Sequence, residues 1–345
     1  MYPRLIVDVR KIRRNAEKLV DMLSKRGIHV AGVTKLFMGE PRIARVYLES
    51  GVKVIADSRF QNVDRMIEAG IEGPFMMIRI PPISHLSEMV GRIEYFLVSE
   101  PEVALRIDEM GEAKLIYMVD VGDLREGVMY YEAAEEIEKV KKSLKRSRIV
   151  GVGTNIGCFG GVLPDEENLR RIVEVAKSVE AEIVSVGGTV YLLALEEGIL
   201  PEGINQFRIG EAILLGTDIT GNRDIPYLEQ ETVVLEAEII ELKLKPSKPE
   251  GRIGLDSMGR KPEFKDRGKR LRAILAVGEQ DVNPAGLKPL DRGAEVVHAS
   301  SDHMIVDVTE VERPIRVGEV MRFRSNYSAT LRAVTSPYVE KVWLE

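Results

Sequence analysis

The chain has a single cysteine, Cys158, among its 345 residues. One cysteine cannot form an internal disulfide, and it excludes metal clusters held by several thiolates. The sequence also lacks an excess of basic residues, because 49 Lys and Arg stand against 55 Asp and Glu and give a net charge of −6. That balance argues against a general nucleic-acid-binding protein, which usually carries a basic face. We therefore expect no nucleic-acid partner.

Long apolar runs are missing too. None approaches the roughly 20 residues that a transmembrane helix needs. The start, MYPRLIVDVRKIRRN, is a short apolar stretch followed by charge, without the organisation of a signal peptide. We expect a cytoplasmic protein with no membrane partner. Hydrophobic residues still make up 44% of the chain, which supports a sizeable core, and the length suggests two domains.

Short apolar segments alternate with amphipathic, helix-like stretches through the first two thirds of the chain. The predicted strands are residues 29–35, 52–58, 75–80, 95–100, 114–122, 148–155, 182–188 and 206–210. The helix-like stretches include 40–51, 58–70 and 164–180, and the first opens near Pro41 and closes at Gly51 as helices commonly do. Eight β/α units predict an α/β fold of the TIM-type (β/α)8 barrel class, with an open doubly wound sheet as the alternative.

The pattern of apolar and polar residues changes from about residue 229. Strand-like segments at 232–246, 270–282, 294–311, 319–334 and 339–344 follow one another with little helix signal. They predict a mainly-β domain of residues 229–345, joined by the N-terminal strand in residues 1–9, after a barrel of residues 10–228. Inside this domain, residues 245–270 are rich in Pro, Gly and charge. So long a loop is usually functional or disordered.

Several predicted barrel strands end on polar residues. They are Lys35, Arg79, Asp120 with Arg125 beyond it, Asn155, Thr189 and Arg208. Active sites of such barrels form at the C-terminal ends of the strands. Each residue alone could be exposed or capped by loop backbone, but several at one barrel mouth indicate a site. Lys35 has a specific use, because a lysine at an apolar strand end can have a depressed pKa, which favours Schiff-base chemistry.

The last two strands end on glycines. SVGGTVYL places Gly188 and Thr189 after the seventh strand, and FRIGEAILLG places Gly210 after the eighth. Glycines let the backbone approach an anion closely, and helix N-termini present free N–H groups. Phosphate sites after strands seven and eight recur in these barrels. Together with Lys35, the pattern suggests a phosphorylated aldehyde bound as an imine.

Longer stretches carry a resemblance to a known family. They are IADSRFQN, MVDVGDLREG, GCFGGVLPDEENL, RIGEAILLG, RAILAVGEQD and ASSDHMIVDVT. Nearly from end to end, the chain resembles the fold-type III pyridoxal-phosphate enzymes of the alanine racemase type, and most closely the ornithine racemases. The resemblance implies an amino-acid racemase with pyridoxal 5'-phosphate as cofactor and with a homodimer in which the β domain of one subunit closes the barrel of the other.

The resemblance also assigns roles by motif. Lys35 corresponds to the lysine that holds the cofactor as a Schiff base, Arg125 to a residue near its phenolic oxygen, and Arg208 to the one facing its pyridine nitrogen. The remaining implied cofactor-binding residues are Asn155, Gly188, Thr189, Gly210, Glu211 and Tyr338.

Arg208 bears on which reaction the family member catalyses. Arginine stays protonated, so the pyridine nitrogen opposite it stays neutral, which suits simple α-proton exchange. Related decarboxylases place an acid there and carry a cysteine motif in the β domain, and this chain has neither. A racemase is therefore preferred over a decarboxylase of a basic amino acid.

The expected mechanism is two-base racemisation, with Lys35 as one acid/base. The sequence departs from alanine racemase at Gly39, where that enzyme has a tyrosine, and the partner-subunit tyrosine that acts as its second base has no clear counterpart. In the loop GRIGLDSMG, Asp256 and Ser257 are the first candidates for the second group. His303 is the other candidate, because imidazole titrates nearest neutrality.

Ornithine, or else lysine, is the expected substrate. Ser301 and Asp302 resemble residues that receive the substrate carboxylate through a backbone amide. Asp302, Glu279 or Glu211 could bind the distal ammonium by charge-assisted hydrogen bonds. Two readings from other classes stay open: a pyridoxal-phosphate carrier without turnover, and an unrelated barrel in which Lys35 is structural or forms an aldolase-type imine.

Overall fold

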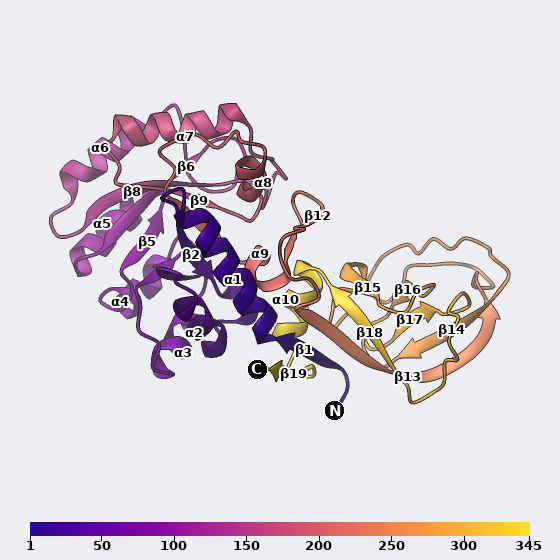
Figure 1. Ribbon diagram of the computed structural model, residues 1–345. Coiled ribbons are helices and arrows are strands. Elements are labelled where there is room, and N and C mark those ends of the chain that lie inside the picture. Colours follow the sequence, from indigo (N-terminus) through magenta and orange to yellow (C-terminus); the bar gives the residue numbers. More distant parts are fainter. The chain divides into compact units, whose positions relative to one another are not determined.

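The computed structural model describes all residues from 1 to 345 and divides the chain into two compact units. The barrel unit is Lys11–Gln230, and the C-terminal unit combines Met1–Arg10 with Glu231–Glu345. Figure 1 shows the strands and helices of the first mainly in indigo to magenta and those of the second mainly in orange and yellow. None of the helices is both long enough and apolar enough to cross a membrane.

The barrel unit contains a closed ring of eight parallel strands. These are β2 (His29–Val33), β3 (Val54–Asp57), β4 (Phe75–Met77), β5 (Tyr95–Val98), β6 (Lys114–Asp120), β8 (Arg148–Asn155), β9 (Ile183–Gly187) and β10 (Gln206–Ile209). The ring closes because β10 pairs with β2 and β5 pairs with β6. The short strand β7 (Val128–Met129) is added beside β6. The predicted TIM-type barrel is confirmed, and the open-sheet alternative is wrong.

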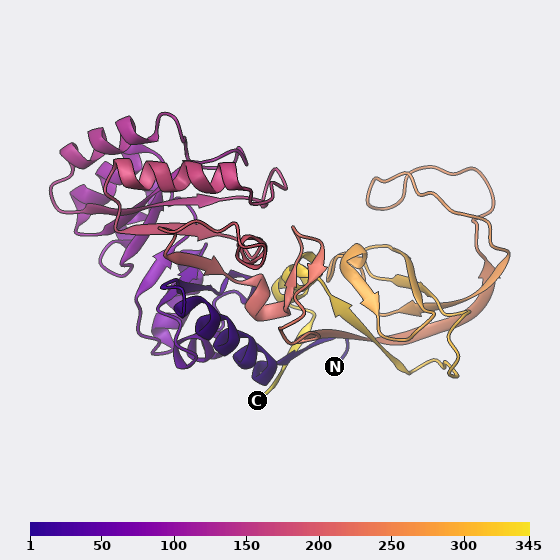
Figure 2. The same cartoon turned by 45° about the horizontal axis from the view of Figure 1, so that its top comes forward.

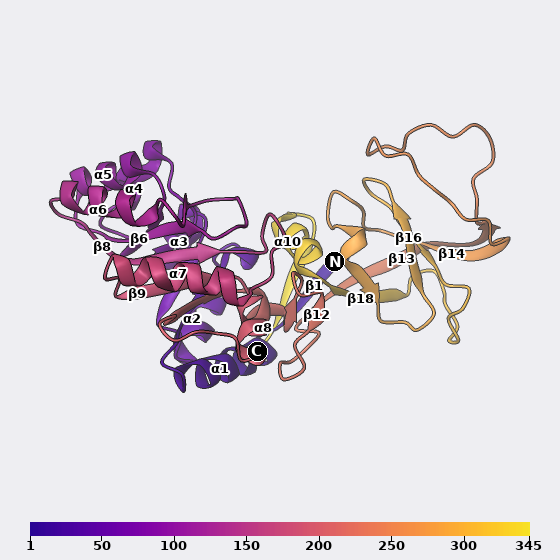
Figure 3. The same cartoon turned by 90° about the horizontal axis from the view of Figure 1, so that it is seen from above.

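Helices connect the strands. They are α1 (Val9–Ser24), α2 (Pro41–Glu49), α3 (Phe60–Glu68), α4 (Leu86–Met89), α5 (Pro101–Met110), α6 (Ala133–Ser143), α7 (Glu166–Ser178), α8 (Tyr191–Glu196) and α9 (Glu211–Leu215), with 3-10 turns η1 (Lys35–Phe37) and η2 (Ile83–His85). Local signals fix their starts: α2 begins at Pro41, and at α7 Asp165 and Asn168 bond each other's backbone N–H in a capping box. Figure 3 shows α7 on the outer side of β8 and β9.

The interior of the barrel is apolar. Its cluster of buried side chains comprises Ala31, Val33, Val54, Ala56, Met76, Leu97, Ile116, Met118 and Val150. Such a packed interior leaves no pore, so polar chemistry is confined to the C-terminal parts of the strands and the loops beyond them.

The C-terminal unit is built on one twisted sheet. Its strands are β1 (Arg4–Asp8), β13 (Val233–Pro246), β14 (Lys269–Leu275), β15 (Leu287–Pro289), β16 (Glu295–Ala299), β17 (Met304–Asp307), β18 (Val320–Ser325) and β19 (Glu340–Leu344). The central path runs β15-β18-β13-β14-β17-β16. The N-terminal strand β1 pairs antiparallel with β13 and parallel with β19, so the chain's first residues belong to this sheet.

One prediction for this unit is wrong. The segment 319–334, expected as strand, is β18 followed by helix α10 (Tyr327–Thr335). Asn326 starts the helix, because its side-chain oxygen accepts the Ala329 N–H at 3.0 Å. Asparagine is a preferred N-cap, and this cap outweighs the strand-like composition of the flanking residues.

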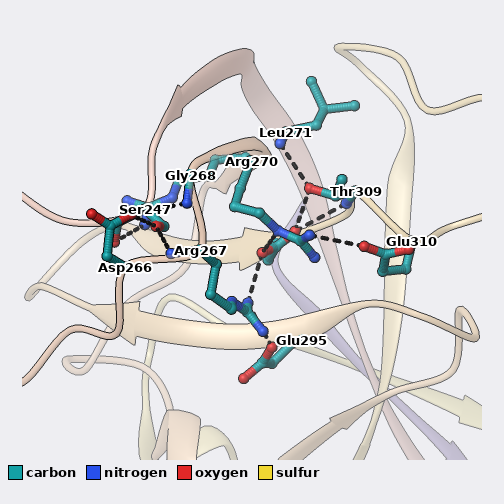
Figure 4. Close-up of polar contacts among 11 residues, drawn as sticks. Ser247, Asp266, Arg267, Gly268, Arg270, Leu271, Glu295, Thr309 and Glu310 are labelled. Carbon is teal, nitrogen blue, oxygen red and sulfur yellow. Dashed lines mark hydrogen bonds and ion pairs between the residues drawn. The ribbon is translucent and has the colours of Figure 1, made fainter.

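Residues 247–268 form a long loop between β13 and β14, drawn in orange in Figure 2. Its two ends meet where the Ser247 N–H donates to the Gly268 carbonyl at 2.8 Å. Arg267 and Arg270 each donate to the buried carboxylate of Asp307 at 2.8 Å. Figure 4 shows the same two arginines reaching Glu295 and Glu310 respectively, and the loop therefore starts from a base fixed to the sheet.

Candidate active site

Lys35 is the first residue of turn η1, directly beyond β2. The strand end is fixed below it, because the buried Thr34 hydroxyl donates to the buried Asp57 carboxylate at 2.7 Å. Lys35 itself is only half-buried, and its Nζ makes no hydrogen bond or ion pair. A lysine without a carboxylate partner at the mouth of a barrel is available for bonding to a ligand.

Gly39 explains why no tyrosine stands four residues after this lysine. Its φ is +65°, in the left-handed region that favours glycine. A Cβ there would lie 2.6 Å from the Asn62 carbonyl oxygen. Any side chain at this position would displace the backbone of α3, so the departure from alanine racemase is built into the fold.

The ends of β9 and β10 form a cradle of N–H and O–H groups. Gly188, with φ +116°, follows β9 and donates its N–H to the Arg208 carbonyl at 3.2 Å. The Thr189 hydroxyl oxygen accepts the Ala212 N–H at 3.0 Å, which leaves the hydroxyl hydrogen free to donate elsewhere. Helix α9 begins at Glu211, so the first amides of this helix have no partner within it.

This cradle lies beside the end of the lysine strand. Residues of β10 pair with those of β2 up to Ile209 opposite Gly32. A Cβ on Gly210 would lie 3.1 Å from the Val33 Cβ, so the start of α9 approaches β2 two residues before Lys35. A side chain at 210 would therefore be in tight contact with the end of β2.

Arg208 on β10 is a buried cation with neutral partners only. Its guanidinium donates to the Ser185 carbonyl at 3.0 Å, to the Ser185 hydroxyl at 2.6 Å and to the Thr154 carbonyl at 2.8 Å. Burial lowers the pKa of Arg208 to about 10, so it stays protonated at neutral pH. Its positive charge has no carboxylate in contact with it. Such a charge can stabilise an electron-rich atom of a ligand.

Arg125 and Asn155 complete the barrel mouth. Arg125 Nη2 lies 3.2 Å from the Asn155 side-chain oxygen, and the Asn155 amide nitrogen donates to the Gly187 carbonyl at 3.3 Å. Arg125 also forms an ion pair with Glu126. A Cβ on Gly187 would lie 2.3 Å from Arg208 Nη2 and 2.7 Å from the Asn155 side chain. The missing side chain of Gly187 is what lets Arg208 and Asn155 come together.

These groups fit a phosphorylated pyridine aldehyde. The chain offers a lysine without a partner, a Gly-Thr turn beside a helix start, and a buried guanidinium that lacks an anion. The structure brings Lys35, Gly188, Thr189, Arg208 and Gly210 to adjacent strand ends of the barrel. The remaining barrel residues, Arg125 and Asn155, meet at the end of β8.

The carboxyl group of Glu211 is already engaged. Its Oε1 accepts from the Thr217 hydroxyl at 2.7 Å and from the Ile219 N–H at 2.9 Å, so the side chain serves the segment after α9. Burial raises the pKa of this carboxyl to about 7. It is therefore a weaker candidate for binding an ammonium group than the sequence implied.

Glu211 gives a pH prediction for stability. Its folded pKa lies above its unfolded value, so between about pH 4.5 and 7 the folded state binds more protons and stability falls as pH rises. Glu211→Gln keeps the Oε1 acceptor and cannot ionise. We expect the wild type to lose up to roughly 3 kcal/mol relative to this variant across that window. Urea unfolding from pH 4.5 to 8 measures it, with the exposed Glu202→Gln as control; parallel curves for all three proteins would contradict it.

In the C-terminal unit, the loop candidate Asp256 is an ion-paired residue. Its carboxylate accepts the Arg260 N–H at 2.8 Å, the Arg260 Nε at 2.9 Å and the Met258 N–H at 2.9 Å. Hydrogen bonds from the Arg260 backbone and side chain lower the pKa of Asp256 to about 2. A carboxylate this acidic is ionised at neutral pH and is a poor proton carrier.

His298 was missed by the sequence reasoning. It lies on β16, and its Nε2 is 3.1 Å from Asp256 Oδ2. The ring of Phe264 packs edge-on against it, with centroids 6.3 Å apart. Both partners come from the 247–268 loop, and His298 lines a cavity of about 480 Å³. Only the fold of the loop reveals this pair, because Asp256 and His298 are 42 positions apart in the chain.

Glu279 is neutralised by two arginines. Its carboxylate accepts from Arg260 at 2.6 Å and from Arg332 at 3.1 Å. The Glu279 N–H donates to the Ser300 carbonyl at 2.9 Å, which places this residue beside the 300–302 turn. Arg260 thus joins two of the predicted residues, Asp256 and Glu279, and was itself missed.

The remaining candidates in this unit are more exposed. Asp302 accepts the Ser301 hydroxyl at 2.5 Å and has no cationic partner. Ser257 and His303 are exposed, and neither side chain makes a hydrogen bond. Tyr338 is 65% exposed, and its backbone N–H donates to Ser336.

Comparison with known proteins gives matches over the whole chain. Residues 7–218 match the family described as alanine racemase, N-terminal domain. A lysine racemase of Thermotoga maritima is 50% identical, and an ornithine racemase of Acetoanaerobium sticklandii is 36% identical; each alignment covers 99% of both chains.

Solved structures share the fold. The alanine racemase from a D-cycloserine-producing Streptomyces lavendulae has a TM-score of 0.76 at 17% identity, covering 100% of this chain and 98% of its own. At that identity, the likeness concerns the arrangement of the barrel and the mainly-β region, and says nothing of the ligand.

Proposed function

We propose that this protein interconverts the L and D forms of a basic amino acid, with pyridoxal phosphate held on Lys35. The chain belongs to the alanine racemase family and is a racemase. One observation carries the proposal. The buried Arg208 guanidinium, with neutral partners only, lies on the strand next to the one that leads to the unpaired Lys35. The cofactor is implied by the family, whose enzymes use it.

Each barrel residue has a part in this proposal. Pyridoxal phosphate, when bound, supplies an aldehyde for the substrate amine and a conjugated ring that acidifies the α C–H bond. Lys35 Nζ would hold the cofactor until the substrate amine replaces it there, and the released Lys35 amine would then take or return a proton on one face of the α-carbon. Thr189 donates its free hydroxyl hydrogen to the phosphate, and the Gly210–Glu211 turn contributes backbone N–H groups.

Arg208 and Arg125 orient the ring. Arg208 remains protonated at neutral pH, so an unprotonated ring nitrogen is its natural partner. That arrangement favours proton exchange over decarboxylation, which supports a racemase. Arg125, which lies beside Asn155, would bind the phenolic oxygen of the cofactor.

The relatives and one acidic residue of the C-terminal unit support the proposal that the substrate has a basic side chain. The sequence favours ornithine, whereas the relative at 50% identity is a lysine racemase. Asp302 carries a negative charge without a cationic partner, whereas Glu279 is held by Arg260 and Arg332. We therefore assign the distal ammonium to Asp302, with Ser301 beside it.

The second acid/base comes from the C-terminal unit. Asp256, Ser257 and His303 are the residues that the sequence offered, and the hydrogen bonds of Asp256 favour its neighbour His298 instead. Nε2 of His298 faces the carboxylate, which fixes the ring and leaves Nδ1 to carry a proton. Asp256 then acts by holding the imidazole.

His298 and His303 form a matched pair for a test. We expect His298→Asn to reduce racemisation about 10²-fold, because one positioned acid/base is worth about 10²–10⁴ in rate. The variant should still exchange the α-proton of one enantiomer with D₂O, through the other base. His303→Asn should racemise normally. Proton NMR of each enantiomer in D₂O measures the exchange; equal losses for both enantiomers in His298→Asn would rule out the assignment.

The assembly is part of the same proposal. We propose a homodimer in which each copy's C-terminal unit completes the other copy's site, as the family resemblance implies. Light scattering of the purified protein should give the mass of two chains, and a fully active monomer would contradict this.

The function itself is tested by a spectrum and a substrate panel. The visible band of the purified protein should disappear on borohydride reduction, with the adduct on Lys35 by peptide mass. Chiral chromatography with L-lysine, L-ornithine, L-arginine and L-alanine then identifies the substrate. Release of CO₂ would establish the decarboxylase alternative. A coloured protein without turnover would establish the pyridoxal-phosphate carrier. A protein that binds no pyridoxal phosphate would establish the unrelated barrel.

A further inference from the structure

Asp123 holds two loops of the barrel unit together. It lies three residues beyond β6, and only 2% of its surface is exposed. Its carboxylate accepts backbone N–H groups of the loop after β8: Gly157 at 3.0 Å, Phe159 at 3.1 Å, Gly160 at 3.0 Å and Val162 at 3.4 Å. Hydrogen bonds to an ionised acceptor are about twice as strong as neutral ones. Four of them on one carboxylate fix the loop to that carboxylate.

The glycines of this second loop shape it around Asp123. Gly157 and Gly161 have φ of +83° and +66°, which turn successive N–H groups inward. A Cβ on Gly160 would lie 3.1 Å from both Asp123 Oδ1 and the Asp123 carbonyl. The stretch GCFGGVL and the Asp of GDLREG therefore form one structural unit, although the proposed function uses neither.

Arg125 is attached to the same unit. It follows Asp123 by two residues, and its guanidinium lies beside Asn155, the last residue of β8, directly before the second loop. Leu124, between Asp123 and Arg125, is 66% exposed with φ +58°. An L residue rarely adopts that conformation, so the bonds on either side must hold it there.

We propose that Asp123 is a positioning residue that sets the place of the Arg125 guanidinium by fastening the 156–163 loop to the 121–127 loop. Arg125 also contacts Asn155 at the end of β8 and its neighbour Glu126, and Asp120 accepts the Gly122 and Leu124 N–H groups of the same loop. Only Asp123 joins this loop to the 156–163 loop through its carboxylate. The role in catalysis rests on the proposed function, in which Arg125 contacts the cofactor. Fastening of the loops does not depend on it.

The first test reads the loops directly, in the protein without added cofactor. In Asp123→Ala, hydrogen exchange of the 157–162 amides should rise at least tenfold, and trypsin should cut after Arg125 at least tenfold faster than in the wild type. Asp123→Asn keeps Oδ1, which accepts three of the four hydrogen bonds. Its exchange and cleavage rates should therefore lie between those of the wild type and those of Asp123→Ala. Asp165→Ala, which removes the α7 cap, is the matched control and should leave both readouts at wild-type values.

The second test is a double-mutant cycle on racemisation. Asp123→Ala should lower kcat/KM about 10- to 100-fold, because small misplacements of a binding group cost up to about 10² in rate. If Asp123 acts through Arg125, the double variant Asp123→Ala/Arg125→Ala should be no slower than Arg125→Ala alone. Asp165→Ala should keep full activity.

The positioning role would be overturned if the losses in kcat/KM of Asp123→Ala and Arg125→Ala multiply in the double variant. Faster loop opening in Asp123→Ala with unchanged kcat/KM would also overturn it. If the wild type racemises no basic amino acid, the proposed function has failed. The hydrogen-exchange and trypsin-cleavage rates then test the fastening of the two loops by themselves. Wild-type values of both rates in Asp123→Ala would overturn the inference. If Asp123→Ala does not fold, Asp123→Asn carries both tests.

Discussion

Replacing Lys35 with alanine is expected to lower racemase activity on the order of 10⁴-fold, because one side chain supplies both the covalent attachment and one of the two acid/base groups. Lys35 makes no hydrogen bond or ion pair in the fold. The variant should therefore unfold at the wild-type temperature when both are measured without cofactor. Loss of activity with retained stability would separate a chemical role from a structural one.

Two further variants sharpen this test. Lys35→Arg keeps the positive charge but cannot form an imine, and should be as inactive as Lys35→Ala. Lys53→Ala removes an exposed lysine just before β3 and should leave activity unchanged. Chiral chromatography with L-lysine and L-ornithine gives the rates. More than a tenth of wild-type activity in Lys35→Ala would reject the assignment and favour a barrel with a structural lysine.

Replacing Arg208 with glutamine is expected to lower kcat about 10²- to 10³-fold, the usual cost of removing one preorganised charge from an active site. The pKa of Arg208 is lowered by burial to about 10, so its charge is present throughout the neutral range and is lost only near pH 10. The substitution removes that charge while keeping one amide donor for the Ser185 and Thr154 acceptors.

The matched control for Arg208 is Arg148→Gln, since Arg148 is an exposed arginine of the same unit, paired with Glu182. It should racemise at the wild-type rate. Arg208→Glu introduces the acid found in the related decarboxylases. We expect it to lose racemase activity, and CO₂ release in the presence of L-lysine reports any change of reaction. Unchanged kcat in Arg208→Gln would show that the buried charge plays no part in proton exchange.

The sequence was sufficient to predict the barrel and the group of polar residues at its mouth. Alternating apolar strands and amphipathic helices impose parallel strands, and parallel strands bring their C-terminal ends to one mouth. Lys35, Thr189 and Arg208 could therefore be grouped from their positions at strand ends alone. Their grouping follows from topology, which local hydrophobic patterns determine.

Other features depended on pairings between distant residues. Helix α10 was missed because a single cap, Asn326, overrides the strand-like residues around it. His298 next to Asp256 was missed because a loop must fold back across the sheet to bring them together.

The sequence by itself determined the family, the fold and the residues expected to hold a cofactor, because these follow from short-range patterns and from motifs of adjacent residues. The tertiary structure alone decided which of the predicted site residues are free. It showed Glu279 neutralised by two arginines, Glu211 bonded within its own unit and Arg208 buried without an anion. The physical reason is that charge pairing and burial are set by neighbours distant in the chain, and no local pattern records them.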